Sequence, residues 1–431
     1  MAWKNWAGNQ RCEPVAVERP ASQDELAAVV KQAAAAGRRV KAVGAGHSFT
    51  DAALTDGVQL KLDRYGAILD VDRERNQVTV QSGISIAALN EQLFALGMAM
   101  PNLGDIAYQS ISGAISTATH GTGAQLTGIA GQVVGMSIVT GDGSIVSCSA
   151  DEESEVFHAA RVGVGALGLI STVTLQCVPA FRLHAIEEPM RVDAVLADLD
   201  SYVDGNDHFE FFWVPHTGWA LTKRNNRTDD PVGGMSRWKF FKEKILLENV
   251  AFGLVNRVGR MRPKLIPRLQ RLVPSSGTTE YVAPSHKIFA SPRFVKFLEM
   301  EYAVPRAAVP EALNRIRSLI DDRGFQIGFP VEVRFTAPDD IPLSTASGRP
   351  TGYLAVHVYK GMAHEPYFRG VEAIMDSLDG RPHWGKLHFQ TAETLAPRYA
   401  EWDTFQAVRR RLDPEGRFTN GYTTRVLGTL D

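Results

Sequence analysis

The chain has 431 residues, of which 44% are hydrophobic and 22% are charged, ordinary values for a globular protein that exclude disorder as the dominant state. Its 46 Lys and Arg nearly balance its 48 Asp and Glu, and a net charge of −2 argues against a dedicated nucleic-acid-binding protein. Three widely spaced cysteines, and no apolar run of signal-peptide or membrane-span length, predict a cytoplasmic location.

The first 178 residues mix short helices and short strands. A capping box, with Ser22 three residues before Glu25, starts a helical pattern that ends at Gly37. Helical spacing also predicts helices at 85–96 and 154–161. Alternating apolar residues predict strands at 39–43, 78–80, 133–139 and 169–178. This mixture is typical of an α+β domain and differs from a regular βαβ array.

After residue 179 the predicted strands become more regular. Period-two alternation predicts strands at 209–214, 299–304, 331–335 and 353–359. Helical spacing predicts helices at 308–323 and 366–378. We therefore expect a first domain over 1–178, a second over 179–380 built on a largely antiparallel sheet, and a C-terminal segment over 381–431.

Two glycine-rich loops in the first domain point to a cofactor with phosphate groups. Gly44 and Gly46 follow the predicted strand 39–43, where glycines permit a tight turn and the close approach of an anion. His47 follows in the same turn, although a loop histidine is more often a surface or capping residue. The second loop, 110–123, is rich in Gly, Ser and Thr. Two such loops suggest a large cofactor held from two sides.

Residues 163–168 have the spacing G-x-G-x-x-G of a dinucleotide-binding loop. Such a loop needs a strand before it and a helix after it, because the helix N-terminus meets the diphosphate. Here the predicted helix 154–161 comes before and the predicted strand 169–178 comes after. The sequence therefore argues against a Rossmann site, and no compact metal-ligand spacing is present.

Two charged motifs in the second half are candidates for a substrate site. Glu332 and Arg334 lie two apart on a predicted strand and therefore share one face. His383 and Lys386 flank a tryptophan and a glycine in the motif HWGK. From the spacing alone, an exposed ion pair and an ordinary loop are the simpler explanations.

Seven motifs in a fixed order resemble those of the aldonolactone oxidoreductases, a family in the vanillyl-alcohol-oxidase class of flavoproteins. They read VGAGHSFTD, TATHGTG, VGVGALGLISTVTLQCVP, SHKIF, FPVEVRF, RPHWGK and EGRFTNGYTTRVLG. The resemblance covers almost the whole chain. It implies an α+β fold with a two-subdomain FAD-binding domain of the PCMH type, a substrate domain with a large antiparallel sheet, and a C-terminal segment that rejoins the FAD domain.

The resemblance also implies where FAD binds. The cofactor-binding residues would be Val43, Gly44, Ala45, Gly46, His47, Ser48, Ser110, Ile111, Ser112, Gly113, Thr117, Thr119, His120, Gly121, Thr122, Gly123, Gly168, Leu169 and Ile170. His47 occupies the position at which many family members bind the 8α-methyl group of the flavin covalently. We therefore expect a covalent bond between His47 and FAD.

Glu332, Arg334 and Lys386 match the charged trio on the substrate side of the flavin in the resembled family, and His383 lies nearby in the sequence. The implied reaction oxidises the C2 hydroxyl of an aldono-1,4-lactone, with L-gulono-1,4-lactone as the best candidate. Hydride would pass to flavin N5, and oxygen would then give hydrogen peroxide and an ascorbate-type product. Lys386, His383 and Glu332 remain alternatives for the catalytic base.

Three other functions remain open at this point. The first is an alditol oxidase acting on a terminal hydroxyl of a polyol, and the second is a lactone dehydrogenase that uses a cytochrome or quinone. The third is a flavin-free binding scaffold with the same fold.

One segment, 223–273, is strongly basic. It contains 13 Lys or Arg and 4 Asp or Glu, a balance of 13 − 4 = +9, which leaves −2 − 9 = −11 for the rest of the chain. Aromatic residues accompany these charges at Trp238, Phe240, Phe241 and Phe252. A solvated surface explains this pattern, and a peripheral contact with a membrane surface is the alternative.

Overall fold

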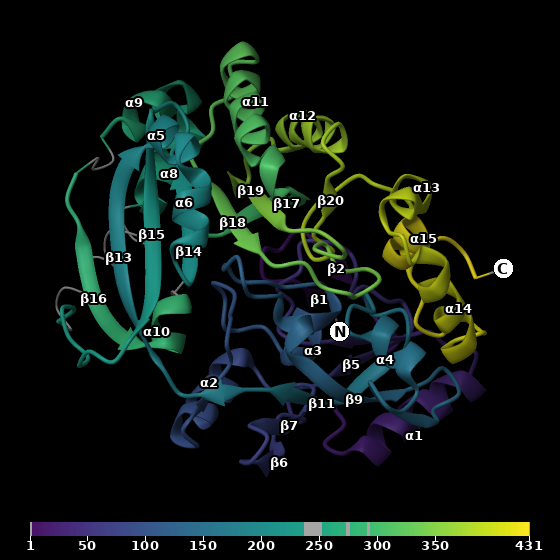
Figure 1. Ribbon diagram of the computed structural model, residues 1–431. Coiled ribbons are helices and arrows are strands. Elements are labelled where there is room, and N and C mark those ends of the chain that lie inside the picture. The colour runs from purple at the N-terminus through teal and green to yellow at the C-terminus, as the bar shows by residue number, and fades with distance from the viewer. Residues whose placement is uncertain (1, 237–251, 273–275, 291–293, 431) are drawn as a thin grey trace.

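The computed structural model describes residues 2–236, 252–272, 276–290 and 294–430. In the first part of the chain, two sheets lie side by side with short helices around them (Figure 1). A parallel sheet has the order β3 (Ala16–Glu18), β5 (Val58–Lys61) and β4 (Val40–Val43). An antiparallel sheet has the order β10 (Ile145–Ser149), β9 (Val133–Val139), β11 (Leu169–Gln176), β7 (Gln77–Gln81) and β6 (Ile68–Asp72).

The helices of this part begin where the sequence places their caps. They are α1 (Gln23–Ala35), α2 (Ile86–Ala95), α3 (Ile111–Ser116) and α4 (Ser154–Ala160). The Ser22 hydroxyl accepts a hydrogen bond from the Glu25 backbone N–H at 3.1 Å, as the capping box predicts. Short strand pairs join β1 (Trp3–Lys4) to β2 (Arg11–Cys12) and β8 (Met98–Ala99) to β12 (Val178–Pro179).

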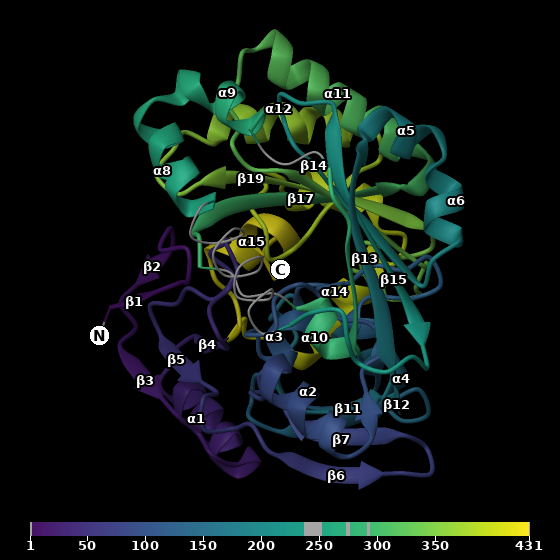
Figure 2. The same cartoon turned by 90° about the vertical axis from the view of Figure 1, so that its left-hand side faces the viewer.

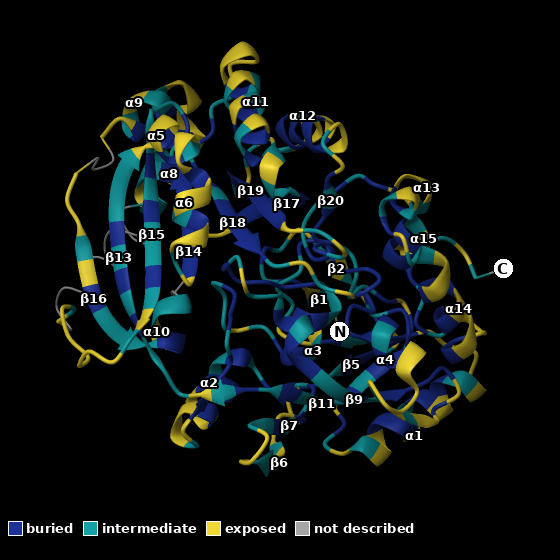
Figure 3. Ribbon diagram, viewed as in Figure 1, coloured by how far each residue is buried: buried dark blue, intermediate teal, exposed yellow. Residues whose placement is uncertain are grey.

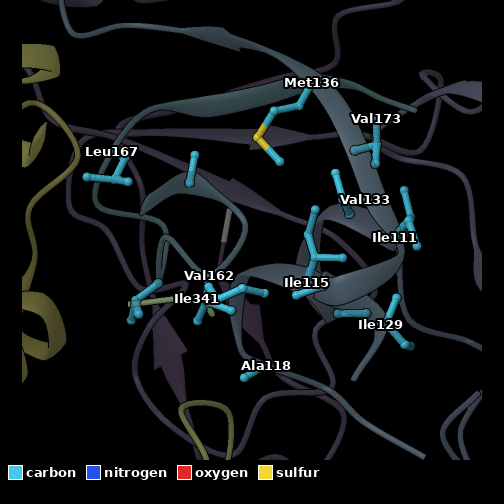
Figure 4. Close-up of a cluster of buried hydrophobic side chains, with 14 of the residues drawn as sticks. Ile111, Ile115, Ala118, Ile129, Val133, Met136, Val162, Leu167, Val173 and Ile341 are labelled. Carbon is cyan, nitrogen blue, oxygen red and sulfur yellow. The ribbon is translucent and has the colours of Figure 1, made fainter. Parts of the chain in front are cut away.

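Helix α3 packs its apolar side into the core of the antiparallel sheet. Figure 4 shows Ile111 and Ile115 of this helix among Ile129, Val133 and Met136, all of them buried. Because the helix is fixed by this packing, its N-terminus is held firmly beside the end of β4.

The second part of the chain is organised around one eight-stranded sheet with the order β16-β13-β15-β14-β18-β19-β17-β20, in which every described pairing is antiparallel. Its strands are β13 (Arg182–Arg191), β14 (His208–Trp213), β15 (Trp219–Thr228), β16 (Thr279–Pro284), β17 (Phe297–Pro305), β18 (Val331–Thr336), β19 (Thr351–Tyr359) and β20 (Arg381–Pro382). Its helices are α5 (Val192–Ala197), α6 (Leu199–Asp204), α8 (Phe252–Met261), α9 (Ile266–Gln270), α10 (Ser285–Phe289), α11 (Val309–Asp322) and α12 (Glu365–Asp376).

The two faces of this sheet differ sharply in chemistry. The outer face is apolar and is covered by helices that include α11 and α12, whose sheet-facing sides are buried and whose opposite sides are exposed (Figures 2 and 3). Since residues two apart on a strand share a face, Val331, Val333 and Phe335 join this outer core. The inner face, which looks toward the first part of the chain, therefore receives Glu332 and Arg334.

The C-terminal segment returns to the first part of the chain through α13 (Ala392–Leu395), α14 (Trp402–Leu412) and α15 (Gly421–Leu427) (Figure 1). The Val40 backbone N–H donates to the Arg417 carbonyl at 2.8 Å, and the Gly141 N–H donates to the Leu412 carbonyl at 2.9 Å. We propose domains at 1–178, 179–380 and 381–431 on this basis. None of the helices in the described ranges is long and apolar enough to cross a bilayer.

Candidate functional site

A groove in the first part of the chain collects the glycine-rich segments, with about 950 Å³ of space free of protein atoms, counting the part open to solvent. Of the sequence-predicted cofactor residues, the groove is lined by Val43, Gly44, Ala45, Gly46, His47, Ser48, Ser110, Ser112, Gly113, Thr117, Gly168, Leu169 and Ile170. The groove is also lined by Ser116, within the predicted loop 110–123, and by residues that the sequence did not single out, among them Lys41, Gln109, Val164, Gly165 and Phe418. Two lining segments, 43–48 and 110–117, thus come from the two predicted glycine-rich loops.

The remaining predicted cofactor residues lie elsewhere. Ile111 is fully buried in the core beneath α3. Thr119, His120, Gly121, Thr122 and Gly123 do not line the groove. Instead, the Gly123 backbone N–H donates to the Phe335 carbonyl at 2.7 Å, which ties this loop to the large sheet.

Close contact between β4 and α3 depends on Gly44. A Cβ atom at this position would lie 2.0 Å from the Ser110 hydroxyl oxygen. That oxygen cannot move freely, because it accepts the capping hydrogen bond from the Gly113 N–H at 3.3 Å. The glycine therefore lets the two walls of the groove approach each other.

We predict that Gly44→Ala sharply reduces the amount of flavin that the purified protein retains, because the added methyl group pushes the two walls apart. Retention is measured as the ratio of flavin absorbance to protein absorbance. The double variant Gly44→Ala/Ser110→Gly removes the colliding atoms and should recover part of the loss. Full retention in Gly44→Ala alone would contradict this account of the groove.

His47 has the properties of a nucleophile placed beside the groove. Its ring stacks on Trp6 with centroids 5.6 Å apart, and Tyr108 lies 6.5 Å away with nearly parallel planes. Burial, and then the positive charge of Lys386, lower the pKa of His47 to about 4, so the imidazole is neutral at pH 7. Its Nδ1 is buried and has no hydrogen-bond partner among the described residues. A neutral imidazole with an unpartnered nitrogen can form a bond to a bound group.

Arg334 on β18 lies at the centre of a buried charge cluster. Its Nε is 2.5 Å from Glu332 Oε1 and 2.7 Å from Oε2 of Glu210 on β14. Burial disfavours the charge on Arg334, but the two carboxylates outweigh it and raise its pKa. Burial also raises the pKa of Glu332, and the charge of Arg334 only partly opposes that shift. Arg334 is only 8% exposed, so the explanation of this motif as an exposed ion pair is wrong.

Lys386 occupies a second cluster beside the first. Its ammonium group pairs with Glu299 and lies 3.9 Å from Glu301 Oε2, both on β17. Burial disfavours the ammonium, but the two carboxylates outweigh it and raise the pKa of Lys386. Burial alone would raise the pKa of Glu299, but Lys386 and then His357 lower it to about 2. Lys386 is therefore held as a cation.

Backbone bonds hold the HWGK motif along β17. The His383 N–H donates to the Glu301 carbonyl at 3.0 Å, and the Leu387 N–H donates to the Glu299 carbonyl at 2.9 Å. The Trp384 indole is fully buried and donates to the Leu343 carbonyl at 2.7 Å. These anchors fix the position of Lys386 between them.

Gly385 lies where the charge clusters adjoin the groove. Its carbonyl accepts a hydrogen bond from the Phe49 N–H at 2.8 Å. A Cβ atom on Gly385 would lie 3.2 Å from the Ser48 hydroxyl and 3.4 Å from the Thr117 side chain, and both residues line the groove. The groove and the polar face of the large sheet are therefore adjacent parts of one site.

His120 belongs to the charge clusters. Its Nε2 lies 2.9 Å from Glu301 Oε1, and its ring stacks on Tyr353 with centroids 3.5 Å apart. His120 was predicted to bind the cofactor, whereas Glu210, Glu299 and Glu301 were not predicted as site residues. The signal for Glu299 and Glu301 was present, because they lie two apart on a predicted strand, just as Glu332 and Arg334 do.

Comparison with known proteins shows the family of the chain. The sequence matches the D-arabinono-1,4-lactone oxidase family over residues 173–426 and the FAD binding domain family over residues 14–149. The chain belongs to the aldonolactone oxidoreductase family. It is 48% identical to an L-gulono-1,4-lactone dehydrogenase of Mycobacterium tuberculosis over 99% of both chains. It is 36% identical to an L-gulonolactone oxidase of Bos taurus, covering 99% of this chain and 98% of that protein.

The fold is also found in a solved structure. A cholesterol oxidase of B. sterolicum superposes with a TM-score of 0.80 at 17% identity, over 99% of this chain and 96% of that one. At this identity the similarity shows the fold alone. Together with the family matches, it establishes a PCMH-type FAD-binding domain joined to a large antiparallel sheet, as the sequence predicted.

The groove fits FAD in its chemistry. Its glycines leave room for close contact with the backbone, and His47 offers an unpartnered nitrogen. Among the described residues, no carboxylate lines the groove that would repel the diphosphate. The aldonolactone oxidoreductase described here is therefore an FAD-dependent oxidoreductase, and the flavin-free scaffold is excluded.

Proposed function

We propose that this enzyme oxidises the C2 hydroxyl group of an aldono-1,4-lactone, with L-gulono-1,4-lactone as its substrate. The observation that carries the proposal is the contact at Gly385, which joins the FAD groove to the buried charges of the large sheet. The names of the relatives at 48% and 36% identity support the choice of lactone.

When bound, FAD supplies an acceptor for the hydride that leaves C2 of the substrate. The protein supplies fixed positive charge. Arg334 and Lys386 both remain protonated, because their carboxylate partners outweigh the effect of burial. Both cations therefore stabilise the negative charge that develops on the substrate oxygen, and they do so most strongly in a site from which water is excluded.

We assign the role of base to Glu332. Lys386 is unsuited to it, because its raised pKa keeps it protonated. In His383, burial lowers the pKa to about 3, and Nδ1 accepts a hydrogen bond from the Gly385 N–H at 3.0 Å, which leaves the ring proton on Nε2. The pKa of Glu332 is raised by burial, which makes its carboxylate a better proton acceptor.

We propose in addition that His47 binds FAD covalently. Its neutral ring and its unpartnered Nδ1 support this proposal. The stacking of His47 on Trp6 orients the ring before the cofactor arrives.

We propose a cytochrome or quinone as the final electron acceptor, in place of the oxygen that the sequence resemblance led us to expect. The relative at 48% identity is named a dehydrogenase, whereas the relative at 36% identity is named an oxidase. This difference favours a cytochrome or quinone over oxygen as the acceptor.

The substrate and the acceptor can be tested together. The purified enzyme is mixed without oxygen with L-gulono-, L-galactono- and D-arabinono-1,4-lactone and with alditols, and the flavin absorbance is followed. We expect L-gulono-1,4-lactone to bleach the flavin fastest and air to restore the colour only slowly. Faster bleaching by alditols would favour the alditol oxidase, and rapid recovery in air would favour oxygen as the acceptor.

We also propose that part of the basic segment 223–273 contacts anionic membrane surfaces. Lys223 and Arg224 do not contribute, because both lie on β15 and pair with Glu210 and Glu188. Trp238, Phe240 and Phe241 lie outside the described residues. The support comes from α8, α9 and their flanks, whose exposed basic and apolar residues include Arg257, Arg260, Arg262, Lys264, Arg268, Arg271, Leu254, Met261 and Leu272.

Binding of the enzyme to anionic lipid vesicles should therefore fall as salt is added, because the Debye length shrinks from about 30 Å at 0.01 M to about 10 Å at 0.1 M. The double variant Arg257→Glu/Arg260→Glu should bind more weakly in a vesicle sedimentation assay. Arg315→Glu, on the exposed side of α11, is the matched control and should bind normally. Absence of binding at low salt would leave the segment as a solvated surface.

A further inference from the structure

Lys41 is a buried lysine of β4 that lies among the residues lining the FAD groove. It is 3% exposed, and its ammonium group donates a hydrogen bond to the Gly165 carbonyl at 3.0 Å. Both residues line the groove, and Phe418 of the C-terminal segment lines it as well. Three distant parts of the chain therefore line the groove together.

Among the described residues, Lys41 is the one basic residue other than His47 in the lining of the groove. Apart from the neutral His47, the other lining residues are glycine, apolar, hydroxyl-bearing or amide residues. The carboxylate of Asp413, whose charge favours the ammonium form of Lys41, already accepts hydrogen bonds from the N–H groups of Arg417 at 2.7 Å and Phe418 at 2.8 Å. Among the described residues, no carboxylate forms an ion pair with Lys41.

A buried ammonium without a paired anion is costly, and only one of its three protons is bound by the Gly165 carbonyl. The groove admits a cofactor that carries two phosphate charges. We propose that Lys41 is the counter-ion of the FAD diphosphate, to which its ammonium group donates a charge-assisted hydrogen bond.

This role couples cofactor binding to a proton. Burial lowers the pKa of Lys41 to about 7 in the absence of FAD; Asp413 and Asp51 oppose that shift and Arg409 adds to it. A bound diphosphate favours the ammonium and raises this pKa. Below pH 7 the lysine is charged in both states, whereas above pH 7 the free protein must first take up a proton. The affinity for FAD should therefore fall as pH rises above 7.

The test uses the full chain with His47→Ala, so that FAD exchanges freely, and measures the FAD dissociation constant by flavin fluorescence from pH 6 to pH 10. With Lys41 present, the affinity should fall steadily above pH 7. Lys41→Met should weaken binding at pH 6.5 by about tenfold to a hundredfold and remove the pH dependence. Lys41→Arg should keep its affinity at pH 9, because arginine stays protonated.

Competition by ADP and adenosine separates the proposed role from a structural one. Adenosine lacks the diphosphate, so Lys41→Met should weaken competition by ADP and leave competition by adenosine unchanged. An equal loss for both ligands would overturn the proposal. So would a pH-independent FAD affinity in the protein that retains Lys41, a result that needs no variant of the lysine itself.

Discussion

Arg334→Ala or Lys386→Ala should slow the reduction of the bound flavin by about 10²–10³-fold, equivalent to about 2.7–4 kcal/mol of lost transition-state stabilisation. Both side chains are buried cations with raised pKa values. Each substitution therefore removes a fixed positive charge from beside the reacting oxygen. Stopped-flow absorbance at saturating L-gulono-1,4-lactone measures the rate directly. Arg334→Lys keeps a positive charge but loses the Nε group that pairs with Glu332 and Glu210. Its rate of flavin reduction should therefore lie between those of the wild type and Arg334→Ala.

Two further variants sharpen this prediction. Glu332→Gln should slow reduction and remove the fall in rate at acid pH, because the wild-type carboxylate cannot accept a proton below its raised pKa. Arg315→Ala is the matched control: this exposed arginine pairs with Glu311 on α11, and such pairs are worth only about 0–1 kcal/mol. Near-normal reduction in Arg334→Ala, Lys386→Ala and Glu332→Gln alike would place the chemistry elsewhere.

His47→Ala should convert the flavin from covalently bound to freely extractable. Acid precipitation of the wild type should leave yellow colour in the protein pellet, whereas the variant should release all of it into the supernatant. The variant should also oxidise substrate more slowly, because we expect the loss of the covalent bond to lower the flavin potential.

The control for His47→Ala is His184→Ala, which removes a partly exposed histidine of β13 that pairs with Glu280. After acid precipitation, the flavin of His184→Ala should stay in the protein pellet. Complete release of flavin from the wild-type protein would show that His47 forms no bond to the cofactor, and that its neutral ring serves only to pack against Trp6.

Much of the fold could be predicted from the sequence, because the spacing of hydrophobic residues indicates which side of a helix or strand is buried. The alternation in 331–335 places Glu332 and Arg334 on one face, and their side chains do meet there. The strands β13 and β15 were missed, because they lie in the more polar half of the sheet and carry many charged residues. Their hydrophobic alternation is therefore weak, although each is ten residues long.

The candidate site was harder to predict wherever contacts between distant segments decide it. The loop 119–123 has the composition of a phosphate-binding loop, yet it packs against the large sheet, and His120 reaches Glu301 there. In the sequence Lys41 is an ordinary polar position of a strand, and only the fold brings it to the Gly165 carbonyl and into the groove lining with Phe418. Neither arrangement leaves a local signal in the sequence.

The most direct test of the central claim is the reduction of flavin by L-gulono-1,4-lactone deuterated at C2, measured without oxygen in a stopped-flow spectrophotometer. If hydride leaves C2 within the site formed by Glu332, Arg334 and Lys386, the deuterated lactone should bleach the flavin several-fold more slowly than the unlabelled lactone. The same isotope effect should persist in Lys386→Ala at a much lower rate. Bleaching that is insensitive to deuterium at C2, or no bleaching by either lactone, would contradict the proposed function.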